Sequence, residues 1–231
     1  MCNIAHYETG QTLQHMKFLR IISGCPQGAR KWHIMSYLLC FCIAKYKEAS
    51  VMNRYLFVID YQNDFVDGAL GFPGAERLDE RIAAKVREYG PGKVLFTRDT
   101  HFENYLKTRE GRNLPVVHCV RGTRGWQVYG QTAKALEEVG ARAIDKRSFG
   151  MDVTDPATAA VLPERADEIE LVGLVSNICV VSNAVVLQSR YPEAAIVVDA
   201  GCTDSFDKSL HEKVLDVLAG FQVKVTGRGT E

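Results

Sequence analysis

Glu170–Gln188, ELVGLVSNICVVSNAVVLQ, predicts a buried strand that passes through a short turn into an apolar helix. The run ELVGL at Glu170–Leu174 is short and apolar, as in a strand covered on both faces. Ile178–Gln188 is apolar over a length typical of a helix. Cys179 stands where this helix is expected to begin. Strand, turn and helix in this order are typical of an α/β fold.

The same alternation continues on both sides of this stretch. The predicted strands are Tyr55–Asp60, Lys93–Thr97, Arg142–Asp145, Ala195–Asp199 and Phe221–Val225, and the predicted helices are Glu76–Tyr89, Gln131–Val139 and Ser209–Leu218. Strands that are apolar and alternate with helices predict a parallel sheet covered by helices on both faces. We therefore expect an α/β fold with a three-layer sandwich architecture.

The composition is that of an ordinary globular protein. The chain has 231 residues, of which 46% are apolar and 24% are charged, so a wholly disordered chain is excluded. The formal net charge is zero, so bulk electrostatics predicts neither a nucleic-acid partner nor a membrane partner. The seven cysteines include no CxxC pair. An odd count without framework spacing predicts reduced thiols and a cytoplasmic protein.

The first 51 residues differ from the remainder of the chain. Their only sustained apolar patch, Ile34–Ala44, has 11 residues, too few to span a bilayer. Met52 directly precedes Asn-Arg-Tyr and the first predicted strand. We expect residues 1–51 to be a leader that is disordered or results from a start site assigned too far upstream, with a targeting segment as the remaining alternative. Residues 52–231 are expected to form the domain.

Residues with reactive side chains gather at the ends of the predicted strands. In parallel α/β sheets, ligands bind beyond the carboxyl ends of the strands. The residues that lie there are Asp60, Asp99, His101, Lys146 and Cys179. The chemistry of the domain is therefore expected at this edge of the sheet.

Cys179 is a candidate nucleophile because it falls in the first turn of a predicted helix, with Asn177 as the expected N-cap. Helix N-termini favour anions, so we expect a lowered pKa for the Cys179 thiol. Free backbone N–H groups at the same place can hold an oxyanion. For this residue alone, the alternative is a buried, inert cysteine.

Two charged residues at other strand ends could assist such a nucleophile. Asp60 is either a cap for the following turn or a working carboxylate. Lys146 is either a solvated surface residue or a positive charge held beside the nucleophile. The residues alone leave both pairs of alternatives open.

Asp99-x-His101, followed by His118, is a reasonable ligand set for a divalent metal that keeps open coordination positions. Residues 52–231 contain only three histidines, and the third is His211. Two of the three fall in this one stretch, which favours the metal site over an exposed loop with unrelated polar residues.

Five motifs together resemble those of the isochorismatase-like cysteine hydrolases, and within that superfamily those of the nicotinamidases. VIDYQNDF, TRDTH, VVHCVRGT, DKRSF and LVGLVSNICV occur in the order and spacing of the family, across Tyr55–Thr226. The resemblance implies a six-stranded, mostly parallel sheet of Rossmann-like topology between helices. It also implies a homo-oligomer, a dimer or a tetramer.

The resemblance implies a catalytic triad of Asp60, Lys146 and Cys179. It further implies an oxyanion hole made by the backbone N–H groups of Val175 and Cys179. A non-proline cis peptide at Leu174–Val175 would shape this oxyanion hole.

The resemblance implies a divalent metal held by Asp99, His101 and His118, usually zinc, iron or manganese. Phe65 would lie against the substrate. The sequence departs from typical nicotinamidases in two places, because Thr100 and Leu114 stand where those enzymes often carry tryptophan.

The expected activity is hydrolysis of a small carboxamide, above all of nicotinamide to nicotinate and ammonia through a thioester, as in NAD salvage. Alternative substrates are ureidoacrylate, maleamate and N-carbamoyl compounds, whose hydrolases often lack the metal ligands. A non-catalytic binding protein on the same fold is the alternative from a different class. The expected partner is a small-molecule amide, with no nucleic acid and no membrane.

Overall fold

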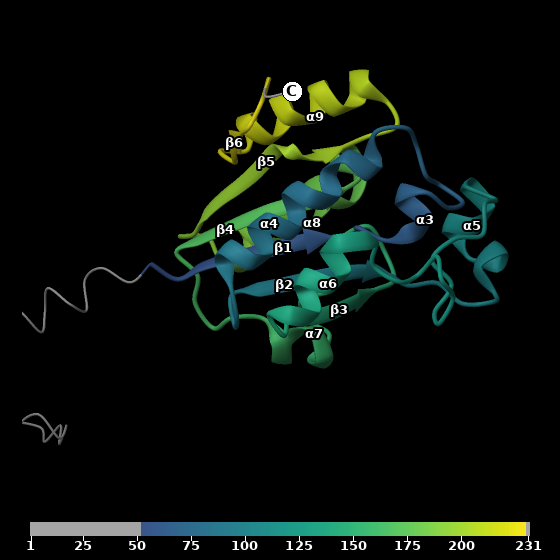
Figure 1. Cartoon of the computed structure of the whole chain (residues 1–231), viewed down its shortest axis with the longest axis horizontal. Coiled ribbons are helices and arrows are strands. Elements are labelled where there is room, and N and C mark those ends of the chain that lie inside the picture. Colours follow the sequence, from purple (N-terminus) through teal and green to yellow (C-terminus); the bar gives the residue numbers. More distant parts are fainter. Residues whose placement is uncertain (1–51, 230–231) are drawn as a thin grey trace, which may run out of the picture. The chain divides into compact units, whose positions relative to one another are not determined.

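A single six-stranded sheet forms the centre of the domain (Figure 1). The computed structural model describes residues 52–229, so the predicted leader, residues 1–51, lies outside the described residues. The strands lie in the order β3-β2-β1-β4-β5-β6, and all neighbouring pairs are parallel. The expected six-stranded sheet is confirmed, and it is wholly rather than mostly parallel. The strands are β1 (Arg54–Ile59), β2 (Val94–Asp99), β3 (Arg142–Lys146), β4 (Glu168–Leu174), β5 (Ala195–Asp204) and β6 (Lys224–Thr226).

Helices connect the strands and cover both faces of the sheet. They are α3 (Asn63–Val66), α4 (Asp79–Tyr89), α5 (Arg109–Asn113), α6 (Gly130–Glu138), α7 (Pro156–Val161), α8 (Val181–Arg190) and α9 (Lys208–Gly220). Three further helical turns are η1 (Ala75–Leu78), η2 (Tyr105–Lys107) and the π-helical turn η3 (Ser176–Val180). Within residues 52–229, no helix has both the length and the apolar character needed to cross a membrane.

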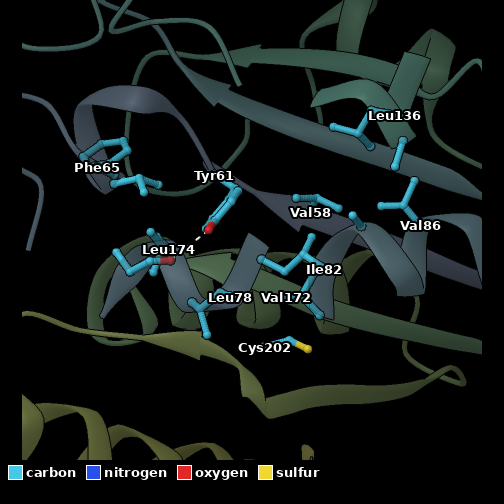
Figure 2. Close-up of a cluster of buried hydrophobic side chains, with 14 of the residues drawn as sticks. Val58, Tyr61, Phe65, Leu78, Ile82, Val86, Leu136, Val172, Leu174 and Cys202 are labelled. Atoms are coloured by element: carbon cyan, nitrogen blue, oxygen red, sulfur yellow. Dashed lines mark hydrogen bonds between the residues drawn. The ribbon is translucent and has the colours of Figure 1, made fainter. Parts of the chain in front are cut away.

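The core has two layers because successive side chains of a strand point to opposite faces of the sheet. Leu56 and Val58 of β1 pack in one layer, whereas Phe57 and Ile59 pack in the other. Figure 2 shows the first layer, where α4 and α6 supply residues such as Ile82. Helices α8 and α9 cover the second layer. The predicted three-layer α/β sandwich is thus confirmed.

The structure differs from the sequence prediction mainly in short elements. Helices α3, α5 and α7 were not predicted, because elements of four to six residues are too short to show a helical period. The predicted helix Glu76–Tyr89 is divided into η1 and α4. The predicted strand Ala195–Asp199 continues to Asp204, since β5 pairs again with β4 after a register shift.

The carboxyl edge of the sheet carries a topological switch point between β1 and β4. From β1 the chain moves outward to β2 and β3, and from β4 it moves outward in the other direction. Gly173 lets β1 and β4 approach closely here, because its φ is +109° and a Cβ would lie 2.0 Å from the carbonyl oxygen of Ile59. Such switch points are where α/β sheets bind ligands.

Candidate active site

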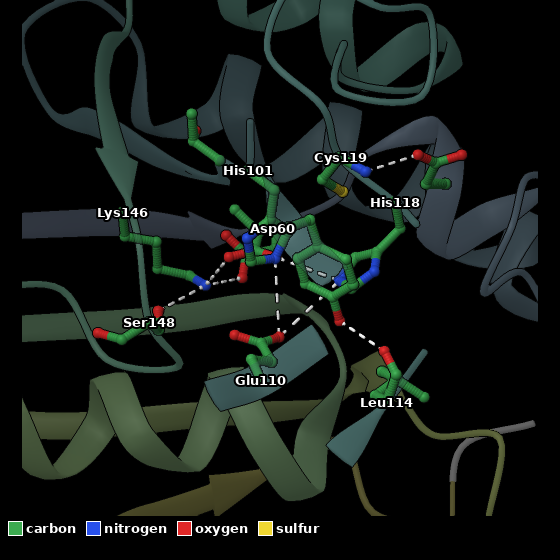
Figure 3. Close-up of polar contacts among 12 residues, drawn as sticks. Asp60, His101, Glu110, Leu114, His118, Cys119, Lys146 and Ser148 are labelled. Atoms are coloured by element: carbon green, nitrogen blue, oxygen red, sulfur yellow. Dashed lines mark hydrogen bonds and ion pairs between the residues drawn. The ribbon is translucent and has the colours of Figure 1, made fainter. Parts of the chain in front are cut away.

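Four strand ends bring the predicted reactive residues together, and Figure 3 shows Asp60 and Lys146 among them. Asp60 directly follows β1, Asp99 ends β2, Lys146 ends β3, and Cys179 lies in η3 after β4. All four residues are buried. Residues that the sequence places at the ends of different strands therefore lie close together in the structure.

Lys146 is the centre of this cluster. Its Nζ lies 2.7 Å from Oδ2 of Asp60, 3.2 Å from Oδ1 of Asp99 and 3.6 Å from Sγ of Cys179. It also donates a hydrogen bond to the carbonyl oxygen of Ser148 at 3.0 Å. Burial disfavours the ammonium ion, but the neighbouring negative charges outweigh burial and hold the pKa of Lys146 well above its ordinary value. The alternative of a solvated surface lysine is wrong.

Asp60 is held in a fixed orientation. Its backbone has φ +43°, in the left-handed region that non-glycine residues rarely adopt. Thr97 donates its hydroxyl hydrogen to Oδ1 of Asp60 at 2.6 Å and accepts the Asp60 backbone N–H at 3.1 Å. Burial raises the pKa of Asp60 against the opposing effect of Lys146. Asp60 is therefore a stronger base than an ordinary aspartate.

The turn that carries Cys179 lacks the predicted Asn177 cap but has the expected cis peptide bond before it. Asn177 was expected to cap a helix, but η3 begins at Ser176 and Asn177 lies inside the turn with a buried Oδ1 that has no hydrogen-bond partner. The Leu174–Val175 peptide bond is cis, as the resemblance implied. The first turn is π-helical rather than α-helical, which a sequence pattern does not reveal.

The predicted lowering of the Cys179 pKa is wrong. Burial raises the pKa of the thiol well above its ordinary value, although Lys146 acts in the opposite direction. The carboxylates of Asp60 and Asp99 add to the effect of burial because they repel a thiolate. The sequence indicated the helix terminus and the Lys146 charge, which both lower the pKa, but it did not show how deeply the thiol is buried. The structure instead holds a protonated thiol beside a strengthened base.

Asn183 ties the Cys179 turn to the segment that follows Lys146. Its amide nitrogen donates to the carbonyl oxygens of Cys179 at 2.7 Å and of Phe149 at 3.0 Å. Its Oδ1 accepts the backbone N–H of Met151 at 2.9 Å. Because Asn183 is fully buried, these bonds fix the two segments relative to each other.

A second group of side chains adjoins Asp99 and has the composition of a metal site. One ligand atom from each of Asp99, His101, Glu110 and His118 can be chosen so that all lie within 4.8 Å of one another. Nε2 of His101 is buried and has no hydrogen-bond partner, although it lies 2.9 Å from Oδ2 of Asp99. Nδ1 of His118 lies 2.7 Å from the carbonyl oxygen of Val116, which leaves Nε2 directed to the cluster.

This donor set fits a divalent cation. Two imidazoles and two carboxylates suit zinc and similar transition metals. Burial disfavours a charged imidazole, yet Asp99 and Glu110 outweigh burial and raise the pKa of His101 to about 9. The cluster therefore attracts positive charge, and the orphaned Nε2 of His101 is a donor atom that a metal ion would satisfy.

Aromatic rings support the two histidines. The ring centroid of Tyr105 lies 4.5 Å from that of His101 and 5.0 Å from that of His118. Phe65 meets His118 edge-on with centroids 5.7 Å apart, so the residue expected to contact substrate borders the metal cluster. The contact of Phe65 with substrate stays a prediction.

The comparison with protein families decides the membership of this chain. The sequence matches the isochorismatase domain over residues 54–228. The chain belongs to the isochorismatase family. It is therefore a hydrolase, and the predicted resemblance is confirmed at the level of the family. No curated protein gave a significant match to the sequence.

Solved structures of nicotinamidases, a pyrazinamidase and an N-carbamoylsarcosine amidase have a similar fold. Nicotinamidase/pyrazinamidase from Bacillus subtilis is 25% identical with a TM-score of 0.66, and the match covers 76% of this chain and 100% of that one. Pyrazinamidase of Pyrococcus horikoshii in complex with zinc is 19% identical with a TM-score of 0.61, covering 75% and 98%. N-carbamoylsarcosine amidase from Thermoplasma acidophilum is 21% identical with a TM-score of 0.59, covering 78% and 98%.

Sequence reasoning missed three residues of this isochorismatase-family site. Glu110 lies on α5, a five-residue helix without a visible period, so nothing marked it as a ligand. Thr97 is an ordinary strand residue by type. Tyr105 lies in the three-residue turn η2, and only its position between Asp99-x-His101 and His118 could have drawn attention to it.

Proposed function

We propose that this protein hydrolyses a small carboxamide by covalent catalysis at Cys179, with nicotinamide as the substrate. One observation carries the proposal: the Cys179 thiol, the Lys146 ammonium and the Asp60 carboxylate form a buried chain of contacts with Lys146 at its centre. Nucleophile, cation and base in contact are what nucleophilic catalysis requires.

In the first step, Asp60 removes the proton of the Cys179 thiol as the thiolate attacks the amide carbonyl carbon. The raised pKa values of both groups suit this transfer, because a strengthened carboxylate base faces a thiol that stays protonated until substrate arrives. Lys146 keeps its charge and stabilises the negative charge that moves between the two.

The tetrahedral oxyanion is held by the backbone N–H groups of Val175 and Cys179. Asp60 then passes its proton to the leaving nitrogen, the C–N bond breaks, and ammonia departs from the thioester. A water molecule that gives its proton to Asp60 attacks the thioester carbonyl. The C–S bond breaks, the carboxylic acid is released, and Cys179 takes back a proton from Asp60.

Asp99, His101 and His118, with Glu110 as a fourth ligand, would hold a divalent metal beside this centre. When bound, such an ion supplies a Lewis acid that can hold an electron pair of the substrate, such as that of a pyridine nitrogen. We propose zinc, and the zinc complex of the pyrazinamidase of Pyrococcus horikoshii supports this choice. Iron and manganese are alternatives.

Nicotinamide is preferred over other amides for two reasons. Lys146 contacts both Asp99 of the metal cluster and the reacting Cys179, and Phe65 offers an aromatic edge next to His118. A second candidate substrate class is N-carbamoyl compounds, because an N-carbamoylsarcosine amidase shares the fold. With nicotinamide as substrate, the protein would serve NAD salvage as a cytoplasmic homo-oligomer, without nucleic-acid or membrane partners.

The proposal is tested by ammonia release from an amide panel. The panel contains nicotinamide, pyrazinamide, ureidoacrylate, maleamate and N-carbamoylsarcosine, and each is assayed with zinc, iron(II) or manganese(II) after removal of bound metal. We expect the highest kcat/KM for nicotinamide. A higher kcat/KM for an N-carbamoyl compound would favour the second candidate, and no ammonia from any member would refute the proposed amidase.

A further inference from the structure

We propose that His211 is a positioning residue that aims the candidate oxyanion hole by holding Ser176. His211 is the one histidine of residues 52–229 outside the metal cluster. The inference rests on the proposed function, because the oxyanion hole matters only if an acyl group is transferred to Cys179.

A single hydrogen bond joins helix α9 to the nucleophile turn. Nδ1 of His211 lies 2.9 Å from Oγ of Ser176, the first residue of η3. Ser176 is fully buried, and among residues 52–229 its hydroxyl has no other hydrogen-bond partner. Burial lowers the pKa of His211, so the ring is neutral near pH 7 and offers one N–H and one lone pair. Without His211 the buried hydroxyl would lose its one protein partner among residues 52–229, and with it the bond that fixes its position.

The position of Ser176 gives this bond a consequence for catalysis. Ser176 lies between Val175 and Cys179, whose N–H groups are the proposed oxyanion donors. Thr203 donates to the carbonyl oxygen of Gly173 at 2.7 Å and so fixes the strand before the turn. The bond to His211 fixes the start of the turn itself. Its loss would let the two N–H groups tilt while Lys146 and Asp60 keep their places.

The surroundings of His211 allow its side chain to be removed without a buried void. The residue lines a cavity of about 550 Å³ between α4, the end of β5 and the first turn of α9, together with Arg81, Asp204 and Lys208. The His211 side chain is only 12% exposed, but its ring borders this open space. Water from the cavity can fill the site of a truncated side chain, so a His211→Ala variant is expected to fold.

The experiment compares His211→Ala with two amide replacements and a matched control. In His211→Asn the amide nitrogen can take the place of Nδ1, whereas in His211→Gln it lies nearer the place of Nε2. Lys213→Ala is the control, because Lys213 is exposed on the same helix. We expect His211→Ala to lower kcat about tenfold, a fraction of the loss seen when a whole oxyanion donor is removed. KM should stay within about twofold, since ground-state binding is unchanged. His211→Asn should restore kcat, and His211→Gln should not.

Alkylation of Cys179 by iodoacetamide separates positioning of the oxyanion hole from displacement of the thiol. The thiol sulfur displaces iodide from carbon without forming an oxyanion, so all four variants should react at the wild-type rate. The Ser176→Ala variant should lose as much kcat as His211→Ala, and the double variant should lose no more than either.

Three outcomes would overturn the inference: wild-type kcat in His211→Ala, a parallel fall of kcat and alkylation rate, or losses that add in the double variant. Wild-type protein that turns over no amide would remove the proposed function, and the inference with it. Wild-type turnover with an unaffected His211→Ala variant would remove the inference alone.

Discussion

Two clusters in this domain contain the same types of residue, a lysine between two carboxylates with a cysteine nearby. In the first, Lys146 lies 2.7 Å from Asp60 and 3.2 Å from Asp99, beside Cys179. In the second, Lys85 lies 2.8 Å from Glu170 and 2.9 Å from Asp199. The cysteine of the second cluster is Cys202, next to Asp199. Residue types and distances hardly distinguish them.

Their places in the fold do distinguish them. The first cluster lies at the carboxyl ends of β1 to β4, and Cys179 lies in η3, the helical turn after β4. The second lies on one face of the sheet, where Lys85 of α4 covers strand residues and Cys202 is inside β5. The Lys146 side chain is 0% exposed and that of Lys85 is 24% exposed. A buried charge cluster at strand ends, beside a helical turn, is placed to act on a ligand, whereas the second cluster joins helix to sheet.

The largest difference between the two clusters is expected in the effect on kcat of replacing their cysteines. Cys179→Ala should lower kcat by about 10⁴-fold or more, as loss of a nucleophile does, while Cys202→Ala should keep kcat within about threefold. Ammonia release under single-turnover conditions measures both. Circular dichroism of each variant checks that the fold is retained. Near-wild-type turnover by Cys179→Ala would show that Cys179 is no more important for catalysis than Cys202.

The two lysines should differ next, in both activity and stability. Lys146→Met leaves Asp60 buried without a counter-ion, which should cost about 3–5 kcal/mol of unfolding free energy and abolish turnover. Lys85→Met leaves carboxylates that keep other donors, Tyr89 to Glu170 and the Gly201 N–H to Asp199. It should therefore cost about 1–3 kcal/mol and leave kcat unchanged.

Urea denaturation measures the unfolding free energies, with Lys146→Arg and Lys85→Arg as charge-retaining controls. Equal losses of unfolding free energy for the two methionine variants would show that the deeper burial of Lys146 does not make its loss more costly. Retained turnover in Lys146→Met would remove Lys146 from the mechanism.

Much of the first cluster could be predicted from the sequence, and the second could not. Strand-end positions placed Asp60, Lys146 and Cys179 at one edge, because the ends of parallel strands meet there. Lys85 and Asp199 lie 114 residues apart, within a helix and a strand. Nothing in either pattern indicates that they meet. Contacts across layers depend on packing that periodicity does not specify.

The fold could also be predicted where the sequence pattern is regular. The prediction failed where structure depends on packing that the pattern does not specify. Long apolar strands and helices such as β4 and α9 were placed within a few residues. The short helix α5 was missed, and with it Glu110. The predicted direction of the Cys179 pKa shift was also wrong. A helix terminus can be inferred from local sequence, whereas the burial that raises this pKa depends on the whole fold.

The metal site should belong to the first cluster alone, since Asp99 contacts Lys146 and is also one of the candidate metal ligands. Glu110→Gln should weaken zinc binding by roughly tenfold or more, as loss of a supporting ligand does. Competition with a chromophoric chelator measures the affinity. Glu103→Gln, an exposed residue nearby, and Asp199→Asn in the second cluster are the controls. Unchanged affinity in Glu110→Gln would leave only Asp99, His101 and His118 as ligands.

The smallest expected difference concerns the alkaline stability contributed by Cys202. Burial raises the pKa of its thiol to about 12, and the Asp199 carboxylate acts in the same direction. In the unfolded chain a cysteine has a pKa of about 8.5, so the native state binds more protons above that pH. The stability contribution is thus complete below about pH 8.5 and is lost as the pH rises toward the native value.

Cys202→Ala should therefore flatten the pH dependence of the unfolding free energy between about pH 9 and 11 by up to roughly 1.4 kcal/mol per pH unit. The slope is the informative quantity, because the small void left by the sulfur shifts the whole curve equally. Urea denaturation in the presence of a reductant gives the two curves. Parallel curves for wild type and variant would mean that Cys202 ionises in the native protein as it does in the unfolded chain. The second cluster would then hold an accessible thiol, and burial would not set the pKa of Cys202.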